Sequence, residues 1–342
     1  MKKRKIIVTG GTGYIGSHTV VELIKSGYEV VIVDNLVNSN LSTLDAIEEL
    51  TGIRPIFENV DLSKEIPAKT FYATYKDADA VINFAALKAV GESVQKPLSY
   101  YSNNLNVLLN TLQGMLDNRI DQIIFSSSAT VYALPNKLPI TEQEPTKRPT
   151  NPYGNTKKIA EEIIEDLTRV SQLMKAISLR YFNPIGAHPS GKLGELPTGV
   201  PNNLMPFITQ TAAGVRKELK VFGNDYDTLD GTAIRDYIHV VDLAKAHVVT
   251  LDRIFSNEME SNFEVFNLGT GIGYSVLDVI NSFERTSGGK LNYAFAPRRE
   301  GDVPELYADP KKANEILGWK AELSLDDMTF SSWNWEKQLR GK

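Results

Sequence analysis

The sequence predicts an α/β protein built on a doubly wound parallel sheet, followed by a smaller C-terminal α/β domain. Three observations point to this fold class. Short runs of β-branched residues alternate with segments of helical period, a glycine-rich turn follows the first run, and the composition changes near Asn183. Because parallel strands need crossover helices between them, this alternation indicates a parallel sheet with helices on both faces.

The N-terminal half supplies the strands of this sheet. Residues 5–9 and 29–34 flank an amphipathic segment, 14–26, which Gly27 ends. The same rhythm predicts further strands at 54–60, 80–85, 122–126 and 175–181, and helices at 65–76, 98–118 and 152–172. Together these strands are enough for a doubly wound sheet.

A second domain is expected from Asn183, where the chain becomes rich in Pro, Gly and Asn. We therefore predict a first domain over 1–182 and a substrate-binding domain over 183–342. A helix at 236–253 and a strand at 263–268 are expected to return to the first domain. Ser324 is expected to open a helix that runs to Leu339.

The composition excludes several kinds of protein. With 342 residues, a net charge of −5 and no cysteine, the chain has no disulfides or thiolate metal ligands, and its charge argues against general affinity for nucleic acid. The basic start at 2–5 is followed by an apolar run too short for a signal peptide, and no stretch approaches a membrane span. We expect no metal, no membrane contact and a cytoplasmic location.

The turn GGTGYIG at 10–16 joins the first strand to the first helix. Such a turn places backbone N–H groups and the positive end of a helix against a pyrophosphate, and larger side chains at Gly10, Gly13 and Gly16 would block that approach. The next strand ends in Asp34, where a carboxylate meets an adenosine ribose and repels a 2′-phosphate. The sequence therefore predicts a Rossmann-type site that binds NAD rather than NADP.

Three more strands end at the same predicted edge of the sheet. The residues there are Asp61 and Leu62 after the third strand, Phe84, Ala85 and Ala86 after the fourth, and Ser126, Ser127 and Ser128 at the fifth. Since a dinucleotide lies over this edge, the first two groups are expected to line the cofactor. At least one of the serines is expected to point into the cleft and relay a proton.

Tyr153 and Lys157 form the candidate catalytic pair. Asn151-Pro152 opens a helix there, and the spacing of the pair puts both side chains on one face. To act as a base at neutral pH, a tyrosine needs its pKa lowered from about 10 to about 7, and a positive charge about 4 Å away supplies that much. Lys157 and an oxidised nicotinamide would carry the charge.

Longer stretches give a more specific signal. They are TGGTGYIGSH at 9–18, LKAVGESVQKPLSYY at 87–101, SSSATVY at 126–132, NPYGNTK at 151–157, LRYFNPIGAHPSG at 179–191, PNNLMPF at 201–207, FGNDY at 222–226, RDYIHVVDLA at 235–244 and APRREGD at 296–302. With them, essentially the whole chain resembles the extended short-chain dehydrogenase/reductase superfamily and, within it, the UDP-glucose 4-epimerase family.

The resemblance implies that tightly held NAD takes a hydride from sugar C4 while Tyr153 removes the 4-OH proton, which Ser128 helps to relay. The 4-keto sugar then turns about its diphosphate link and recovers the hydride on its other face, so UDP-galactose and UDP-glucose interconvert.

Matching positions imply which further residues bind each ligand. For NAD, besides the glycines, the strand ends and Ser128, Tyr153 and Lys157, they are Tyr14, Ile15, Asn35, Asn38, Ser39, Lys88, Asn103 and Phe182. For the UDP-sugar, besides Lys88, Ser128 and Tyr153, they are Asn183, Asn203, Leu204, Val221, Phe222, Arg235, Arg299, Asp302 and Leu306. Arg235 and Arg299 also suit the physics, since a diphosphate needs forked cations in a protein of negative net charge.

Several alternatives stay open. Leu306 stands where the family pattern has tyrosine with restriction to UDP-glucose and UDP-galactose, and smaller residues with N-acetylated sugars. A UDP-N-acetylglucosamine or dual-specificity epimerase is therefore an alternative. A nucleotide-sugar dehydratase is disfavoured because Ala129-Thr130 replaces its Asp-Glu pair. A dehydrogenase that releases NADH is a further alternative, as is a non-catalytic NAD-sensing regulator, which would have no use for the catalytic pair.

The resemblance also implies a homodimer formed through the helices at 98–118 and 152–172. The sequence itself shows only that these segments are long and amphipathic. Packing against the core of one chain would explain the same pattern.

Overall fold

The computed structural model describes residues 3–299 and 302–341, so Glu300 and Gly301 of the APRREGD stretch lie outside the described residues. The described part of the chain forms two compact units. Unit 1 comprises the residues up to Ala133, Thr146–Arg180 and Ala244–Phe266, and unit 2 comprises Leu134–Pro145, Tyr181–Leu243 and the residues from Asn267 onward. The segment 244–266 thus belongs to the same unit as the N-terminal strands.

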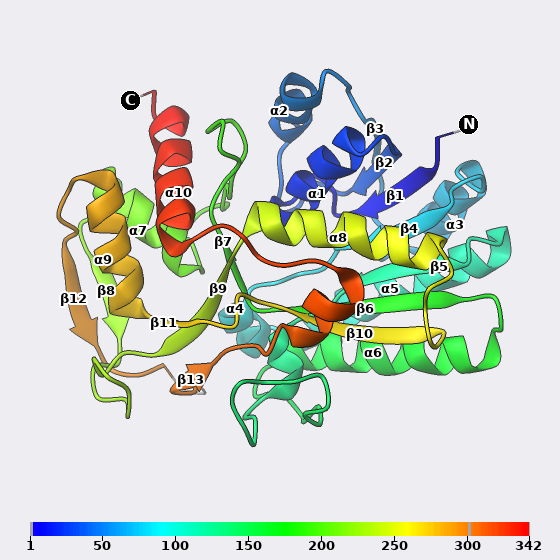
Figure 1. Ribbon diagram of the computed structural model, residues 1–342. Coiled ribbons are helices and arrows are strands. Elements are labelled where there is room, and N and C mark those ends of the chain that lie inside the picture. The colour runs from blue at the N-terminus through cyan, green and yellow to red at the C-terminus, as the bar shows by residue number, and fades with distance from the viewer. Residues whose placement is uncertain (1–2, 300–301, 342) are drawn as a thin grey trace. The chain divides into compact units, whose positions relative to one another are not determined.

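Unit 1 is built around a parallel sheet (Figure 1). Within residues 3–299 and 302–341 its seven strands follow the order β10-β6-β5-β4-β1-β2-β3. They are β1 (Lys5–Thr9), β2 (Glu29–Asp34), β3 (Ile56–Asn59), β4 (Ala80–Asn83), β5 (Gln122–Ser126), β6 (Lys175–Tyr181) and β10 (Phe263–Leu268). Pairing from β3 to β6 is parallel throughout, which confirms the predicted fold class. The order reverses between β1 and β4, so their carboxyl ends form the switch point where such sheets bind ligands.

Helices cover both faces of this sheet. They are α1 (Tyr14–Lys25), α2 (Ser42–Thr51), α3 (Glu65–Thr74), α4 (Val90–Gln95), α5 (Pro97–Asn118), the 3₁₀ turn η1 (Ala129–Tyr132), α6 (Pro152–Val170) and α8 (Val240–Phe255). Tyr72, Leu108 and Ile164 of α3, α5 and α6 pack with Val81 and Ile123 in one core, and Figure 1 shows α1 and α8 on the other face. No helix in the described ranges is both long and apolar enough to cross a membrane.

The start predicted for the helix at 236–253 is wrong. Residues Ile234–His239 form strand β9, and α8 begins only at Val240. The apolar run of Tyr237 and Ile238 is buried because β9 pairs with strands on both sides, and a run of this length does not distinguish a strand from a buried helix. Pairing with distant strands therefore decides this segment.

Unit 2 contains two small sheets and a helical layer. Strands β7 (Asn183–Ile185), β11 (Gly273–Ser275) and β13 (Glu305–Leu306) pair with β9, and β12 (Tyr293–Ala296) pairs with β8 (Leu219–Phe222). The helical elements are α7 (Leu204–Ala212), α9 (Val276–Ser287), the π-helical turn η2 (Ala313–Leu317) and α10 (Leu325–Leu339). Ser324 and Asp327 form a capping box at the start of α10, which confirms the helix start predicted at Ser324.

Replacing Gly114 by alanine is expected to destabilise unit 1. Gly114 lies on α5 where α3 crosses it, and a Cβ there would come within 2.2 Å of the buried ring of Tyr72. We expect the free energy of unfolding to fall by about 2 kcal/mol or more, measured by urea denaturation. Gly91→Ala on α4 is the matched control, because a Cβ at Gly91 meets no heavy atom within 4 Å. Equal stability of the two variants would contradict this packing.

Candidate functional site

The turn between β1 and α1 lies at the switch point of unit 1. Gly10 has φ of +69°, which glycine adopts without steric cost, and a Cβ there would lie 2.8 Å from the backbone nitrogen of Ala85, which follows β4. A Cβ on Gly16 would lie 2.4 Å from the carbonyl oxygen of Gly10. The turn therefore holds the ends of β1 and β4 against the first turn of α1.

The start of α1 fits a ligand phosphate. Gly13 is the N-cap, and among the described residues no side chain caps this helix and no acidic residue lies in its first turn. Tyr14 and Ile15, both half-buried, begin the helix. Because a helix N-terminus presents N–H groups and partial positive charge, this end suits the pyrophosphate of a dinucleotide.

Asp34 is fixed beside this turn at the end of β2. Its carboxylate accepts hydrogen bonds from the backbone of Thr12 at 3.3 Å, the backbone of Leu36 at 2.9 Å and the hydroxyl of Ser39 at 3.2 Å. The Ser39 hydroxyl lies 2.7 Å from that of Thr12. Asn35 and Asn38 extend into solvent on the same loop. The structure thus brings Asp34 and Ser39 together at the place predicted for the adenosine ribose.

The other predicted cofactor residues follow β3 and β4. Asp61 accepts from the backbone of Ser63 at 3.0 Å, and Leu62 behind it is buried. After β4, the backbone of Ala85 donates to the Thr9 hydroxyl at 3.2 Å, and the Phe84 ring contacts that of His247. Ala86 is half-buried beside them. These residues line the carboxyl edge of the sheet, as predicted from their strand-end positions.

Hydrogen bonds of the Asn104 side chain, which the sequence did not predict, hold the loop that carries Lys88. Asn104 of α5 accepts from the backbone of Leu87 at 2.8 Å and donates to its carbonyl at 3.0 Å, and it donates to Thr156 of α6 at 3.1 Å. Asn103 donates to Asn104 at 3.0 Å. The Lys88 ammonium lies 5.9 Å from the centre of the Tyr14 ring. The loop, α5 and α6 are thus tied together.

The start of α6 carries the candidate catalytic pair. The Asn151 side chain caps the helix by accepting from the backbone of Gly154 at 2.8 Å. Lys157, which is 4% exposed, donates to the carbonyl of Ser126 at 2.6 Å, and its nitrogen lies 6.0 Å from the centre of the Tyr153 ring. Cap, helix and strand end together fix the ammonium on the same side of α6 as the phenol.

Ser128 is the serine that reaches the phenol. It is the N-cap of η1, where its hydroxyl accepts from the backbone of Thr130 at 3.3 Å, and it hydrogen-bonds with Tyr153. Ser127 is fully buried. The structure therefore joins Ser128, Tyr153 and Lys157 in one group.

Burial controls the ionisation of this group. It raises the pKa of Tyr153 to about 12 despite the hydrogen bond with Ser128, and it lowers the pKa of Lys157 to about 8 although Glu161 acts in the opposite direction. The lowered tyrosine pKa expected from the sequence is thus not a property of the chain alone. Lys157 points at a carbonyl and is itself desolvated, so the phenol needs a second positive charge nearby to ionise.

The predicted UDP residues of unit 2 gather around a carboxylate. Asp302 lies 2.8 Å from Arg299 and 3.7 Å from Arg235, and the Arg299 guanidinium stands 5.3 Å from the centre of the Phe222 ring. Leu306 of β13 pairs in register with Arg235 of β9. The two arginines and the aromatic ring suit a nucleoside diphosphate.

The other predicted residues of unit 2 are placed separately. Asn183 is exposed at the start of β7, whose neighbour is β9. Asn203, the N-cap of α7, donates to Glu195 at 2.7 Å and precedes Leu204. Val221 is buried in the core of unit 2, and Phe182 is buried just before β7. Among the described residues, no hydrogen bond or ion pair joins these side chains to Arg235 or Arg299, and their part in binding remains a prediction.

Asp236 is a further buried carboxylate that sequence reasoning missed. It accepts from the backbone of Thr270, Gly271 and Ala308 at 2.8, 3.0 and 3.2 Å. It thereby anchors the segment after β13 next to Arg235. The RDYIH stretch contains Asp236, but nothing in the sequence shows which backbone groups it accepts from.

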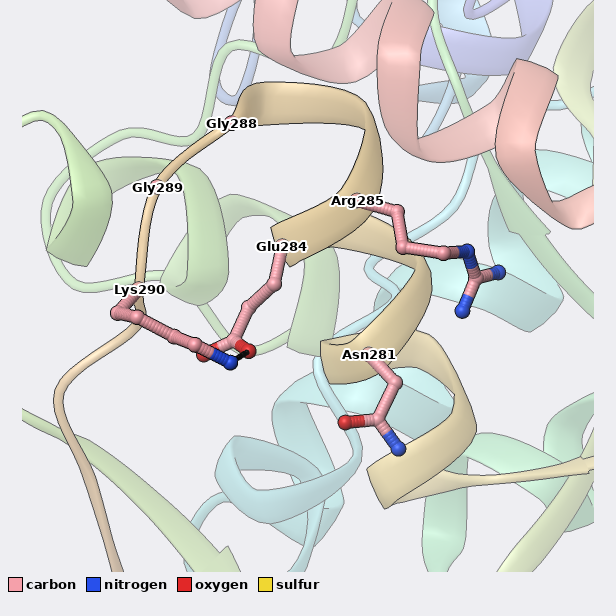
Figure 2. Close-up of a pocket in the computed structure, with 6 residues that line it drawn as sticks. All are labelled: Asn281, Glu284, Arg285, Gly288, Gly289 and Lys290. Carbon is pink, nitrogen blue, oxygen red and sulfur yellow. Dashed lines mark hydrogen bonds and ion pairs between the residues drawn. The ribbon is translucent and has the colours of Figure 1, made fainter.

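A surface pocket at the end of α9 is not a candidate. Figure 2 shows its lining, with Lys290 folded back towards Glu284 and Arg285 pointing away from both. Arg285 pairs with Asp326 at 2.7 Å. The pocket lies at a helix C-terminus, which carries partial negative charge, and its cations already have partners. None of the predicted site residues lines it.

The described ranges contain no group of three or more His, Asp or Glu side chains placed to hold a metal ion.

The burial of Lys157 is expected to cost stability. Since its folded pKa of about 8 lies below the 10.5 of a free lysine, the folded chain binds fewer protons than the unfolded chain between these pH values, and the free energy of unfolding rises with pH there. Lys157→Met should therefore be more stable than the wild type by about 2 kcal/mol at pH 7, with the gain shrinking towards pH 10.

Urea denaturation at both pH values measures this, and Lys158→Met is the control because Lys158 forms an ion pair with Glu162 near the surface. A gain independent of pH, or shared by Lys158→Met, would contradict the electrostatic origin.

Comparison with known proteins agrees with this geometry. Residues 7–331 match the family model described as GDP-mannose 4,6 dehydratase. The chain is 50% identical over 331 residues to the UDP-glucose 4-epimerase of Bacillus subtilis (strain 168), covering 97% of this chain and 96% of that one. It is 49% identical over 339 residues to the UDP-glucose 4-epimerase of Drosophila melanogaster, with coverage of 97% and 96%.

Among solved structures, the UDP-glucose 4-epimerase of Bifidobacterium longum in complex with NAD+ and UDP superposes with a TM-score of 0.94 at 49% identity, covering 98% of both chains. Identity of this level extends over nearly the whole chain. The chain therefore belongs to the UDP-glucose 4-epimerase family of the extended short-chain dehydrogenases/reductases.

Proposed function

We propose that this protein interconverts UDP-galactose and UDP-glucose by reversible epimerisation at C4, with NAD held tightly throughout. The observation that carries the proposal is the Ser128–Tyr153–Lys157 group at the carboxyl edge of a sheet whose switch point fits a pyrophosphate. The relatives that are 49% and 50% identical are UDP-glucose 4-epimerases.

The residues at the switch point would hold NAD. Gly10, Gly13 and Gly16 admit the pyrophosphate, and Asp34 accepts hydrogen bonds from the adenosine ribose. The other residues that would line the cofactor are Tyr14, Ile15, Asn35, Asn38, Ser39, Asp61, Leu62, Phe84, Ala85, Ala86, Lys88, Asn103 and Phe182. When bound, NAD accepts the hydride from C4 of the sugar and later returns it.

The chain's own residues move the proton. The Tyr153 oxygen takes the proton of the 4-OH group as C4 becomes a carbonyl. Ser128, which is hydrogen-bonded to the phenol, helps to relay this proton from the sugar to Tyr153. Lys157 carries the positive charge that favours the phenolate. When the hexose has presented its other face, Tyr153 returns the proton to the C4 oxygen. Because C4 would also recover the hydride that it gave up, the reaction would cause no net oxidation.

The arginines of unit 2 would hold the diphosphate while the hexose turns. Arg235 and Arg299 have forked guanidinium groups that match phosphate oxygens, and Phe222 and Asp302 lie beside them. The remaining residues proposed to contact the UDP-sugar are Asn183, Asn203, Leu204, Val221 and Leu306. Holding the substrate by its nucleotide leaves the sugar free to rotate about the link.

Dehydration is disfavoured by the residues after Ser128. Elimination of water from C5 and C6 needs acid and base groups beyond the tyrosine, and Ala129 and Thr130 of η1 carry no carboxyl group. An epimerase function therefore fits the site better than the dehydratase function that the name of the matching family model would suggest.

The protein is further proposed to form a homodimer through α5 and α6 and to reside in the cytoplasm. Leu98, Leu109 and Leu116 of α5 are 82, 45 and 39% exposed. Their spacings of 11 and 7 residues place them on one face of the helix. An exposed apolar stripe of this kind suits a second copy of the same helix.

The function is tested by incubating purified protein with UDP-galactose without added NAD. We expect UDP-glucose to form, and Tyr153→Phe to keep its fold and bound NAD but lose roughly 10²- to 10⁴-fold in turnover, because only the proton acceptor is removed. Tyr28→Phe is the control, since Tyr28 bonds Asp252 away from the catalytic pair. Absence of UDP-glucose, with NADH accumulating when NAD is added, would refute the proposal. Running UDP-N-acetylglucosamine in parallel decides whether Leu306 admits N-acetylated sugars.

Leu109→Glu is expected to convert the dimer to a monomer without unfolding it, because the charge would be buried in the interface while the residue is 45% exposed in one chain. Analytical ultracentrifugation measures the molecular mass. The control is Val170→Glu, because Val170 is 81% exposed at the far end of α6. A wild-type monomer, or a variant that stays dimeric, would contradict the proposed interface.

A further inference from the structure

A buried ion pair lies one helical turn beyond Lys157. Glu161, on the same face of α6, is 5% exposed and accepts from Arg180 of β6 through both carboxylate oxygens, at 3.0 Å and 2.6 Å. Ser178 donates to it at 2.9 Å. The carboxylate is thus held away from Lys157, which donates instead to the Ser126 carbonyl.

Arg180 has a second partner in the catalytic region. Its other terminal nitrogen donates to the Tyr132 hydroxyl at 2.9 Å, and its guanidinium lies 4.9 Å from the centre of the Tyr132 ring. Tyr132 is fully buried and ends η1, the turn that begins after Ser128. One guanidinium therefore joins α6, which carries Tyr153 and Lys157, to the turn that positions Ser128.

Stability alone is a weak reason for such a pair. Desolvating two charges costs about as much as their attraction returns, and apolar replacements of similar volume are often neutral. Without Arg180, however, Glu161 would be a buried, uncompensated anion four residues from Lys157 on the same face. That anion would attract the ammonium away from the phenol.

The charged and titratable groups around this part of α6 are few among the described residues. They include Tyr153 and Glu161 on the helix itself, Arg180 on β6, Tyr132 on η1, and Tyr100 and Glu92 on α5 and α4, which are hydrogen-bonded to each other. Tyr101 of α5 accepts from Asn155 at 2.7 Å, and Lys158 and Glu162 of α6 pair with each other nearer the surface. Of these, Glu161 is the group whose charge acts on Lys157.

We propose that Arg180 is a positioning residue for the catalytic group. By binding Glu161 and Tyr132 together, it limits the attraction of Lys157 to the Glu161 carboxylate and fixes η1, and with it Ser128, against α6. This proposal rests on the proposed function, since it concerns the same proton transfer.

The chain offers a matched control pair. Arg253 and Glu264, also in unit 1, form a second buried ion pair with contacts of 2.7 and 2.8 Å, and both are 8% exposed. Neither residue contacts Tyr153, Lys157 or Ser128 in the contacts described. Arg253→Met and Glu264→Gln therefore reproduce the loss of a buried pair without the proposed role.

The test is the pH profile of kcat for the NAD-containing enzyme, in which the alkaline limb reports loss of the Lys157 charge. Glu161→Gln, which keeps the shape of the side chain and one of its two acceptor oxygens, should move this limb to lower pH by on the order of one pH unit, since a nearby anion is removed and the Arg180 charge is left uncompensated. Arg180→Met should move it to higher pH, and the double variant should return it towards the wild type. Tyr132→Phe should lower kcat without moving the limb, while the control variants leave the limb in place.

A readout independent of turnover is the ¹³Cε chemical shift of Lys157 in lysine-labelled protein, assigned with Lys157→Met. The pH at which this chemical shift changes should differ among the variants in the same order as the alkaline limb of kcat. The proposal would be overturned if the alkaline limb and the Lys157 titration stay at the wild-type pH in both single variants. It would also be overturned if they move in the same direction in Glu161→Gln and Arg180→Met. If Arg180→Met fails to fold, Glu161→Gln still decides the result by either readout. A wild type without epimerase activity would instead refute the proposed function, and the Lys157 titration would still test the electrostatic role.

Discussion

The burial of one ammonium group is the constraint around which unit 1 is arranged. Lys157 is placed under the carboxyl end of β5, where water is excluded and the proton is held less tightly than in solution. A buried ammonium tolerates this only with a good acceptor, and the Ser126 carbonyl at 2.6 Å provides it. The cap at Asn151, the hydrogen bonds of Asn104 and the Arg180 network all fix the helix that carries this lysine.

The two units supply different kinds of chemistry. Unit 1 presents hydrogen-bond donors, a helix end and a titratable pair at one edge of a parallel sheet. Unit 2 presents guanidinium groups beside an aromatic ring on short strands. This division suits the proposed reaction, in which the nucleotide part of the substrate would stay bound while only the hexose exchanges atoms with Tyr153 and the cofactor.

Much of this could be predicted from local pattern. The limits of β1, β2 and β5 match the predicted segments because each is an apolar run bounded by polar or glycine residues, and those of β6 match although Ser178 and Arg180 interrupt its apolar residues. Tyr153 and Lys157 could be predicted as a pair because their spacing is a local feature, and the strand-end position predicted that at least one of Ser126, Ser127 and Ser128 points into the cleft. The choice of Ser128 among the three came from the resemblance to the family.

What the pattern could not show depends on contacts between distant residues. Strand β9 was taken for part of a helix because its pairing with β7, β11 and β13 is not written in its own residues. Glu161 and Arg180 are 19 positions apart, and only the fold shows that they meet. The spacing of Lys157 and Glu161 was the one local hint. The raised pKa of Tyr153 was likewise unpredictable, since it comes from burial.

The carboxylate of Asp302 between Arg235 and Arg299 has a consequence for how strongly salt affects substrate association. Because it already neutralises part of the arginine charge, a diphosphate bound there as proposed would exchange with an internal anion rather than meet two bare cations. The long-range attraction of the substrate is thereby reduced, and so is the effect of dissolved salt on its association. Discrimination between ligands then depends on the short-range geometry of the guanidinium groups. A lone inorganic anion would gain little binding free energy there, whereas a nucleotide would gain much.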